Sequence, residues 1–379
     1  MRSRGLNFVL LLAILFGLTW ARRNRLSRLR SHPSTVAPST QLGEVQPGLT
    51  VPNAIPAPGT SSVVQRKVQQ LRDSNSAAEN RRILLELRVA LAAMAKSEAS
   101  STIREMLSSG VDVQTQIEFE VGDGGRLQGA NTLRVFLLDN LGAIDPKAAA
   151  EIARGILIKP ESPDEWAICL RNLAKGDSSE EAQRFLRDRL RILLRHEPWQ
   201  NNPSIGYLEA FDTTVYIGGY QLVPELTRLM RLTNNPGVAH AAFLAVDRLA
   251  ANEPAATLSS LAEDWTLMQG REATRAGFFA RADVSNAEQR QLVERYLLTL
   301  PPGSPELDAF ADVFPNENYR ISKNLLTVTP PRSGSVIQQR DRATLLVIEE
   351  WMAEKRFQGV LPQLRTVQNR LRTFTAPER

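Results

Sequence analysis

From residue 130 to the C-terminus, apolar residues recur at three- and four-residue spacing in segments of about one helix length. This period places the apolar side chains on one face of a helix, whereas a half-buried strand would alternate at every second residue. The pattern predicts an all-α protein with helices over 130–141, 147–158, 164–174, 181–194, 238–251, 255–268 and 287–300. A last pair is expected over 339–357 and 360–374.

Residue types that start helices precede these segments. Proline follows Asp or Asn at 145–146, 202–203 and 235–236, and proline is favoured in the first turn of a helix. Serine is followed three residues later by glutamate at 162–165, 178–181 and 285–288. In such a capping box the serine oxygen accepts a backbone N–H of the first turn and the glutamate returns a bond. The same helices are therefore predicted by two independent signals.

Paired into hairpins, these helices give a repeat of roughly 33 residues with one longer gap, which is a solenoid period. The first helices of the units are expected to begin near Asn131, Asp164, Ser204, Val238, Arg271 and Pro305. Two stretches interrupt the period, at 198–224 and 314–338. Around residues 277–279, Arg271, Arg275, Arg281 and Asp283 are expected to form polar links between neighbouring units.

Strand patterns are scarce in this sequence. The exception is 115–129, where apolar and polar residues alternate over 116–121 and Gly122-Asp123-Gly124-Gly125 follows. Alternation ahead of a glycine-rich turn is typical of a small β-hairpin. A large β-domain is excluded.

The alternating helices resemble HEAT-like or armadillo-like α-solenoids. Residues 239–249 are similar to the second helix of such a unit, and the resemblance extends over 63–379. Apolar spacing and small residues define these families, so the resemblance assigns no catalytic residue. It implies an irregular solenoid that binds a protein partner, because stacked hairpins expose an extended concave surface.

The N-terminal residues 1–30 have the composition of a membrane-address segment. An uncharged apolar run over 6–21 lies between Arg2 and Arg4 on one side and a cluster of five arginines over 22–30 on the other. A cleaved signal peptide is one interpretation, with cleavage near Ala21. A retained anchor is the other, because arginines at both ends extend the reach of a short apolar segment. Both place the protein at a membrane, with the following domain expected outside the cytoplasm.

Residues 31–62 are rich in proline, serine and threonine and carry almost no charge. Such a segment cannot bury enough apolar surface to fold, so a disordered linker is predicted there.

Once the leader is removed, the charge balance argues against nucleic-acid binding. Residues 1–31 hold seven of the 46 basic residues and none of the 41 acidic ones, so the rest carries 39 against 41, a net of −2. Affinity for nucleic acid needs basic groups concentrated on the folded domain. The expected partners are the membrane, through the leader, and another protein.

Residue types for metal or nucleophilic chemistry are few. Beyond the leader and linker the chain has two histidines, His196 and His240, and one cysteine, Cys169. A zinc site needs three or four such ligands, so neither a metal nor a cofactor is predicted. Cys169 lies on an apolar helix face, where a buried thiol is expected. No catalytic residue is assigned.

One stretch, 197–220, has a composition that plain repeats do not require. It concentrates aromatic and acidic residues that form the candidate binding surface: Trp199, Tyr207, Glu209, Phe211, Asp212, Tyr216 and Tyr220. Aromatic faces beside carboxylates are typical of sugar- or peptide-binding grooves, and paired carboxylates can hydrolyse a glycoside. Equally, a long connection between helices needs aromatics to seal its underside.

The main hypothesis is a membrane-tethered or exported helical-repeat scaffold for a protein partner. The alternative is a carbohydrate- or peptide-acting domain that uses 197–220.

Overall fold

The computed structural model describes residues 60–318, 322–328 and 333–375. Residues 1–59 lie outside this part, and with them the predicted membrane-address segment and all but the last three residues of the predicted linker. Those three residues belong to helix α2 (Thr60–Asp73). None of the helices in the described ranges is long and apolar enough to cross a membrane.

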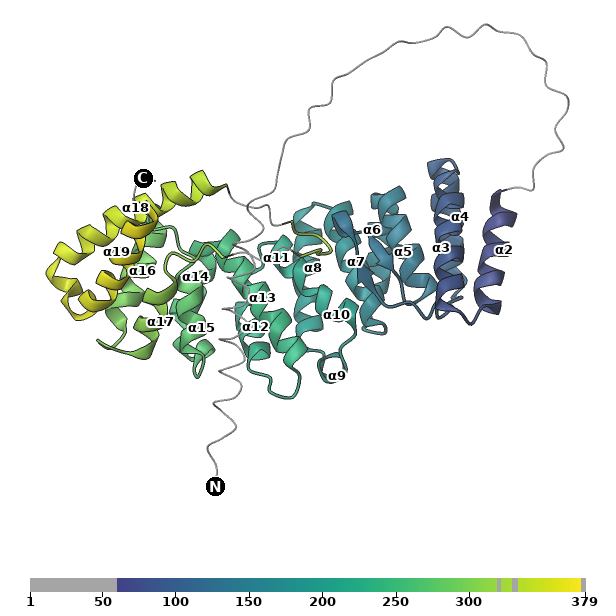
Figure 1. Cartoon of the computed structure of the whole chain (residues 1–379). Helices are drawn as coiled ribbons and strands as arrows, with labels where there is room; N and C mark the ends of the chain where they lie inside the picture. Colours follow the sequence, from purple (N-terminus) through teal and green to yellow (C-terminus); the bar gives the residue numbers. More distant parts are fainter. Residues whose placement is uncertain (1–59, 319–321, 329–332, 376–379) are drawn as a thin grey trace, which may run out of the picture. The chain divides into compact units, whose positions relative to one another are not determined.

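The described part is mostly helical, as predicted, and its helices follow one another in chain order (Figure 1). After α2 come α3 (Ala77–Ala92), α4 (Lys96–Ser108), α5 (Leu133–Ile144), α6 (Pro146–Ile156), α7 (Pro163–Gly176), α8 (Glu180–Arg195), α9 (Glu197–Asn201), α10 (Ile205–Glu209), α11 (Phe211–Tyr216), α12 (Val223–Met230), α13 (Pro236–Asn252), α14 (Pro254–Glu263), α15 (Glu272–Phe279), α16 (Ala287–Thr299), α17 (Pro305–Val313), α18 (Gly334–Ala353) and α19 (Leu361–Thr375). Short 3-10 turns lie at Asp123–Gly125, Tyr220–Leu222, Trp265–Met268 and Lys355–Val360.

The six predicted first helices begin within two residues of the expected positions. Their observed first residues are Leu133, Pro163, Ile205, Pro236, Glu272 and Pro305. Caps explain this agreement for all of these helices except α15, because a side-chain oxygen that accepts an orphan N–H fixes where a helix starts. Asn235, for example, accepts the N–H of Val238 at 3.3 Å.

One of the three predicted capping serines is in place, and two lie one residue away from the observed cap. Ser162 accepts the N–H of Glu165 at 3.3 Å, as predicted. At α8 the cap is Ser179 instead of Ser178. At α16 it is Asn286 instead of Ser285, because the Ser285 hydroxyl donates to Asp283 while the Asn286 amide oxygen accepts two N–H groups.

The helices from α5 onward pack in two rows. In the first row, each helix contacts the next member of the series α5, α7, α10 and α11, α13, α15, α17 and α19. In the second row, α8, α12, α14 and α16 contact one another in the same way. The core lies between the rows, where Trp166, Tyr207, Phe278 and Phe310 are fully buried. Residues 239–249 fall within α13, between α12 and α14.

Polar side chains link equivalent positions of successive units. The partners are separated by 31 to 36 residues, close to the predicted period, in pairs that include Arg134 with Glu165, Asn131 with Asp164, Arg191 with Glu225, Arg248 with Asp212, Arg281 with Asp247 and Arg275 with Glu306. The predicted links are therefore confirmed for Arg275 and Arg281. The Arg275 and Glu306 pair is bidentate and buried, with N–O distances of 2.7 and 2.6 Å.

The predicted β-hairpin is confirmed. Strands β1 (Glu120–Val121) and β2 (Leu127–Gly129) pair antiparallel, with Glu120 opposite Gly129. Arg171 of α7 holds its turn, because its Nη1 donates to the carbonyl of Gly125 and to Asp139, each at 2.7 Å.

Both stretches that interrupt the period contain defined structure. Residues 198–224 include most of α9 and all of α10 and α11. In the second stretch α18 starts at Gly334, and residues 322–328, hereafter the strap, cross back over the first row. There the strap contacts α11, α13 and the turn of the β-hairpin.

Candidate functional site

Three of the predicted aromatic residues pack inside the protein. Trp199, Tyr207 and Phe211 are at most 7% exposed, and their rings form an edge-to-face series with Trp166 of α7. Successive ring centroids lie 5.4, 6.2 and 5.4 Å apart. Such pairs add to the stability that burial of the rings already supplies. These rings join α7 to the short helices α9, α10 and α11.

The other two aromatic residues, Tyr216 and Tyr220, are exposed, at 46% and 37%. They lie at the end of α11 and in the following 3-10 turn. The structure therefore divides the predicted surface into a buried ring cluster and two exposed tyrosines.

The two predicted carboxylates lie close enough to influence each other. Burial raises the pKa of Glu209, and the negative charge of Asp212 raises it further, while Arg248 opposes the shift. Asp212 is 5% exposed and accepts hydrogen bonds from the strap and from Arg248. Its carboxylate therefore holds a segment of the protein in place.

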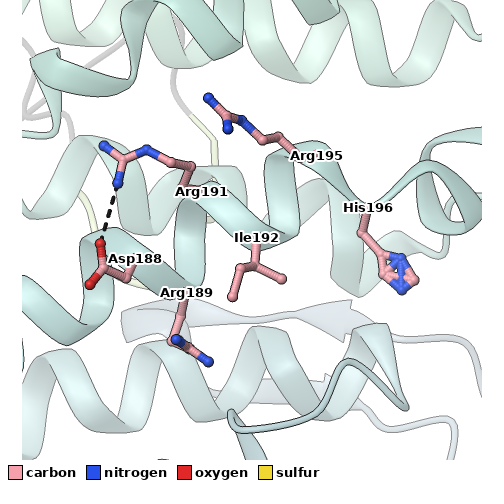
Figure 2. A pocket seen from close by; sticks show the side chains of 6 residues that line it. All are labelled: Asp188, Arg189, Arg191, Ile192, Arg195 and His196. Atoms are coloured by element: carbon pink, nitrogen blue, oxygen red, sulfur yellow. Dashed lines mark hydrogen bonds and ion pairs between the residues drawn. The ribbon is translucent and has the colours of Figure 1, made fainter.

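A shallow depression of about 490 Å³ lies beside the buried rings, on the second half of α8 (Figure 2). Its lining is Asp188, Arg189, Arg191, Ile192, Arg195 and His196. Three arginines and one aspartate leave this lining with a net positive charge, although Arg191 pairs with Asp188 at 3.2 Å. Ile192, at 37% exposed, adds an apolar contact to it.

Two of these arginines are held toward α12. Arg191 and Arg195 both donate to Glu225, at 3.3 and 2.7 Å. Arg189 is held toward α6, where it donates to the carbonyl of Leu157 at 3.3 Å. A guanidinium that is already oriented loses less conformational freedom when it binds a carboxylate.

His196 connects the depression to the buried rings. Its ring stacks on Trp199 with centroids 4.4 Å apart, and burial lowers its pKa. The predicted binding segment therefore borders the α8 surface, although most of its own rings face inward.

The predicted burial of Cys169 is confirmed, and burial raises the pKa of its thiol. Within the described ranges, no three side chains of His, Cys, Asp or Glu gather as a metal site would require.

Comparisons with protein-family models, with curated proteins and with solved structures found no match. The α8 surface was not predicted from the sequence, although a signal for it exists. Five arginines fall within twelve residues of α8, at positions 184, 187, 189, 191 and 195. The helical spacing places Arg184, Arg187, Arg191 and Arg195 on one side of α8, whereas Arg189 points away from them toward Leu157.

Proposed function

We propose that residues 60–375 form an irregular HEAT-like solenoid that binds a protein partner, and that the partner presents an acidic segment to the solvent side of α8. The observation that carries this proposal is the arginine concentration around the depression on α8. Guanidinium groups bind carboxylates through two parallel hydrogen bonds, so a row of them suits aspartate and glutamate side chains.

A protein fits this surface better than a nucleic acid does. Ile192 lies among the arginines and offers an apolar contact that a phosphate backbone would not use. The excess of basic residues elsewhere in the chain lies in residues 1–31, outside this surface. An acidic segment with an apolar residue matches both features.

The same proposal includes the membrane. Residues 1–30 either anchor the protein or direct its export before cleavage near Ala21. Protease protection with membrane fractionation tests the location, and N-terminal sequencing of the mature protein separates the two routes. Recovery of the uncleaved protein in the soluble cytoplasmic fraction would contradict both.

The α8 surface is tested with Arg184→Glu combined with Arg187→Glu. Both side chains lie on α8 outside the pairs with Glu225, and Arg184 is exposed, so the helix should stay folded. The matched control is Arg295→Glu with Arg342→Glu, which has the same charge change on exposed positions of α16 and α18. Each full-length protein is titrated with a labelled glutamate-rich peptide containing one leucine.

We expect the α8 variant to bind this peptide at least about tenfold more weakly than the wild type and the control. Equal binding by all three proteins would contradict the proposal. A single-stranded oligonucleotide and vesicles with anionic lipid are tested in parallel. Stronger α8-dependent binding to either would replace the acidic protein segment as the ligand class.

A further inference from the structure

The strap makes contacts that the packing of neighbouring repeat units does not require. Asp212 accepts the backbone N–H groups of Leu326 at 2.7 Å and Thr327 at 2.9 Å, and it also accepts the Thr327 hydroxyl. These partners lie more than 110 residues further along the chain. In a solenoid each unit contacts its immediate neighbours, so contacts at this separation call for another explanation.

Arg248 of α13 donates hydrogen bonds to two side chains at the beginning of the strap. Its Nη2 donates to Ser322 Oγ at 2.5 Å and to Asn324 Oδ1 at 3.0 Å. Its Nη1 faces Asp212 at 3.4 Å, so the two charged groups form one polar site. Arg248 and Asp212 together therefore contact both ends of the strap.

Between these polar contacts, Leu325 is fully buried and serves as the apolar anchor. Its carbonyl oxygen lies close to Gly125. A Cβ added to that glycine would be only 2.1 Å from the Leu325 oxygen. Gly125 also has a φ of +75°, which favours glycine. Lys323 adds an ion pair with Asp123 at 3.3 Å. The hairpin turn thus accepts the backbone of a segment that bends at residues 325–326.

These are the contacts with which proteins bind peptides: hydrogen bonds to successive backbone N–H groups, one apolar anchor and a few side-chain contacts. The strap belongs to no helix or strand. The helices beneath it contact one another directly, α7 with α11 and α11 with α13. The site would therefore keep its framework without the strap.

We propose that Asp212, Arg248 and the hairpin turn form a peptide-binding site that the strap fills in cis, and that a segment of a partner protein with the same bend takes this site when the strap leaves. The partner segment carries an amide or hydroxyl side chain, then a leucine-sized anchor, then a hydroxyl two residues later, as Asn324, Leu325 and Thr327 do. This site shares no residue with the α8 surface. Each of the two can fail alone.

Because the strap is tethered at both ends, its effective concentration at the site is on the order of millimolar. A free peptide therefore competes poorly with it. The test replaces residues 322–328 with seven glycine and serine residues in the full chain. A labelled peptide with the sequence of residues 320–330 is then added, and its fluorescence anisotropy is measured.

We expect the peptide to bind the strap-replaced protein at least about tenfold more tightly than the wild type. Adding Asp212→Ala should abolish this gain, whereas Asp73→Ala, at an exposed aspartate of α2, should leave it unchanged. A peptide with Leu325→Asp should not bind. Equal binding with and without Asp212 would overturn the proposal. Dimerisation of the wild type that Asp212→Ala abolishes would also overturn it, because the occupant would then be a second copy.

Hydrogen exchange of the unaltered protein decides the question even if the strap-replaced variant does not fold. If the strap can leave, peptides covering Leu326 and Thr327 should exchange through a local opening, faster than those of α13. Exchange of the strap only together with α13, at the rate of global unfolding, would show that the strap is a fixed part of the fold and would overturn the proposal.

Discussion

Two buried aspartates, Asp164 and Asp212, use the same chemistry at very different distances along the chain. Asp164 accepts from Asn131 at 2.6 Å, from Ser204 Oγ at 2.5 Å and from the N–H of Gly206 at 3.0 Å. Its partners lie at the starts of neighbouring units. Asp212 also pairs with Arg248 of the next unit, but its other partners lie in the strap, which follows α17.

The difference separates two ways of stabilising a row of helices. Links like those of Asp164 lie within the cooperative packing of adjacent units, so their loss weakens the whole array. The contacts of Asp212 with the strap connect distant parts that already have their own supports. Their loss should open one segment and leave most of the array folded.

Asp164→Ala should have the largest effect. It leaves the half-buried amide of Asn131 and the buried N–H of Gly206 without their acceptor, and each unsatisfied buried group costs about 1–3 kcal/mol. We expect the free energy of unfolding in urea to fall by about 3 kcal/mol. Asp73→Ala, at an exposed aspartate of α2, is the control and should change it by less than about 0.5 kcal/mol. A loss below 1 kcal/mol for Asp164→Ala would show that the link is dispensable.

Gly206→Ala tests the same link without removing the carboxylate. The added Cβ would lie 2.2 Å from Asp164 Oδ1 and 2.9 Å from its Cα, so α7 and α10 must separate. A loss of about 2 kcal/mol is expected from the displaced contacts. Gly237→Ala in α13 meets nothing closer than 3.5 Å and should be neutral or slightly stabilising. Differential scanning calorimetry compares the two, and equal melting temperatures would refute the steric argument.

Asp212→Ala should lower the free energy of unfolding by only about 1 kcal/mol, because the strap contributes few of the contacts that hold the rows together. Its main effect is local. Trypsin should cut after Lys323 at least about tenfold faster than in the wild type, since the strap must leave the first row to be cleaved. Mass spectrometry identifies the cut. Early cleavage throughout the helices instead would mean that Asp212 supports the whole array, as Asp164 does.

Glu209→Gln should have the smallest effect, and its sign depends on pH. Since the folded protein raises the pKa of Glu209 above its ordinary value of 4.5, the ionised group opposes folding. The variant should therefore be slightly more stable than the wild type at neutral pH, by less than about 1 kcal/mol. The gain should vanish as pH falls through the raised pKa to below 4.5. A gain of the same size at pH 3.5 would contradict this cause.

Local signals account for what could be predicted from the sequence. Helix starts were predicted well because a cap such as Asn235 and the apolar period act within a few residues. Links such as that between Arg275 and Glu306 follow from the same period, because it sets which side chains face the next unit.

The sequence contains no comparable local signal for the contacts of the strap. Asp212 looks like any acidic residue near a helix start, and its partners come more than 110 positions later. Gly125 suggested only a turn, and its role as the close neighbour of Leu325 depends on tertiary structure. The aromatic composition was likewise ambiguous, because a tyrosine such as Tyr207 is suited both to a binding groove and to the core. The structure buries it.

The contact between Gly125 and Leu325 also depends on the number of helices that lie between them in the chain. Solenoids change length by duplicating or losing a unit, and each change would displace everything beyond it by one step of the stack. Here the hairpin turn and the strap approach each other so closely that there is no room for a Cβ at Gly125. Adding or deleting one hairpin between α7 and α15 would pull them apart. A change in the number of units in this part of the chain would therefore cost the protein this contact.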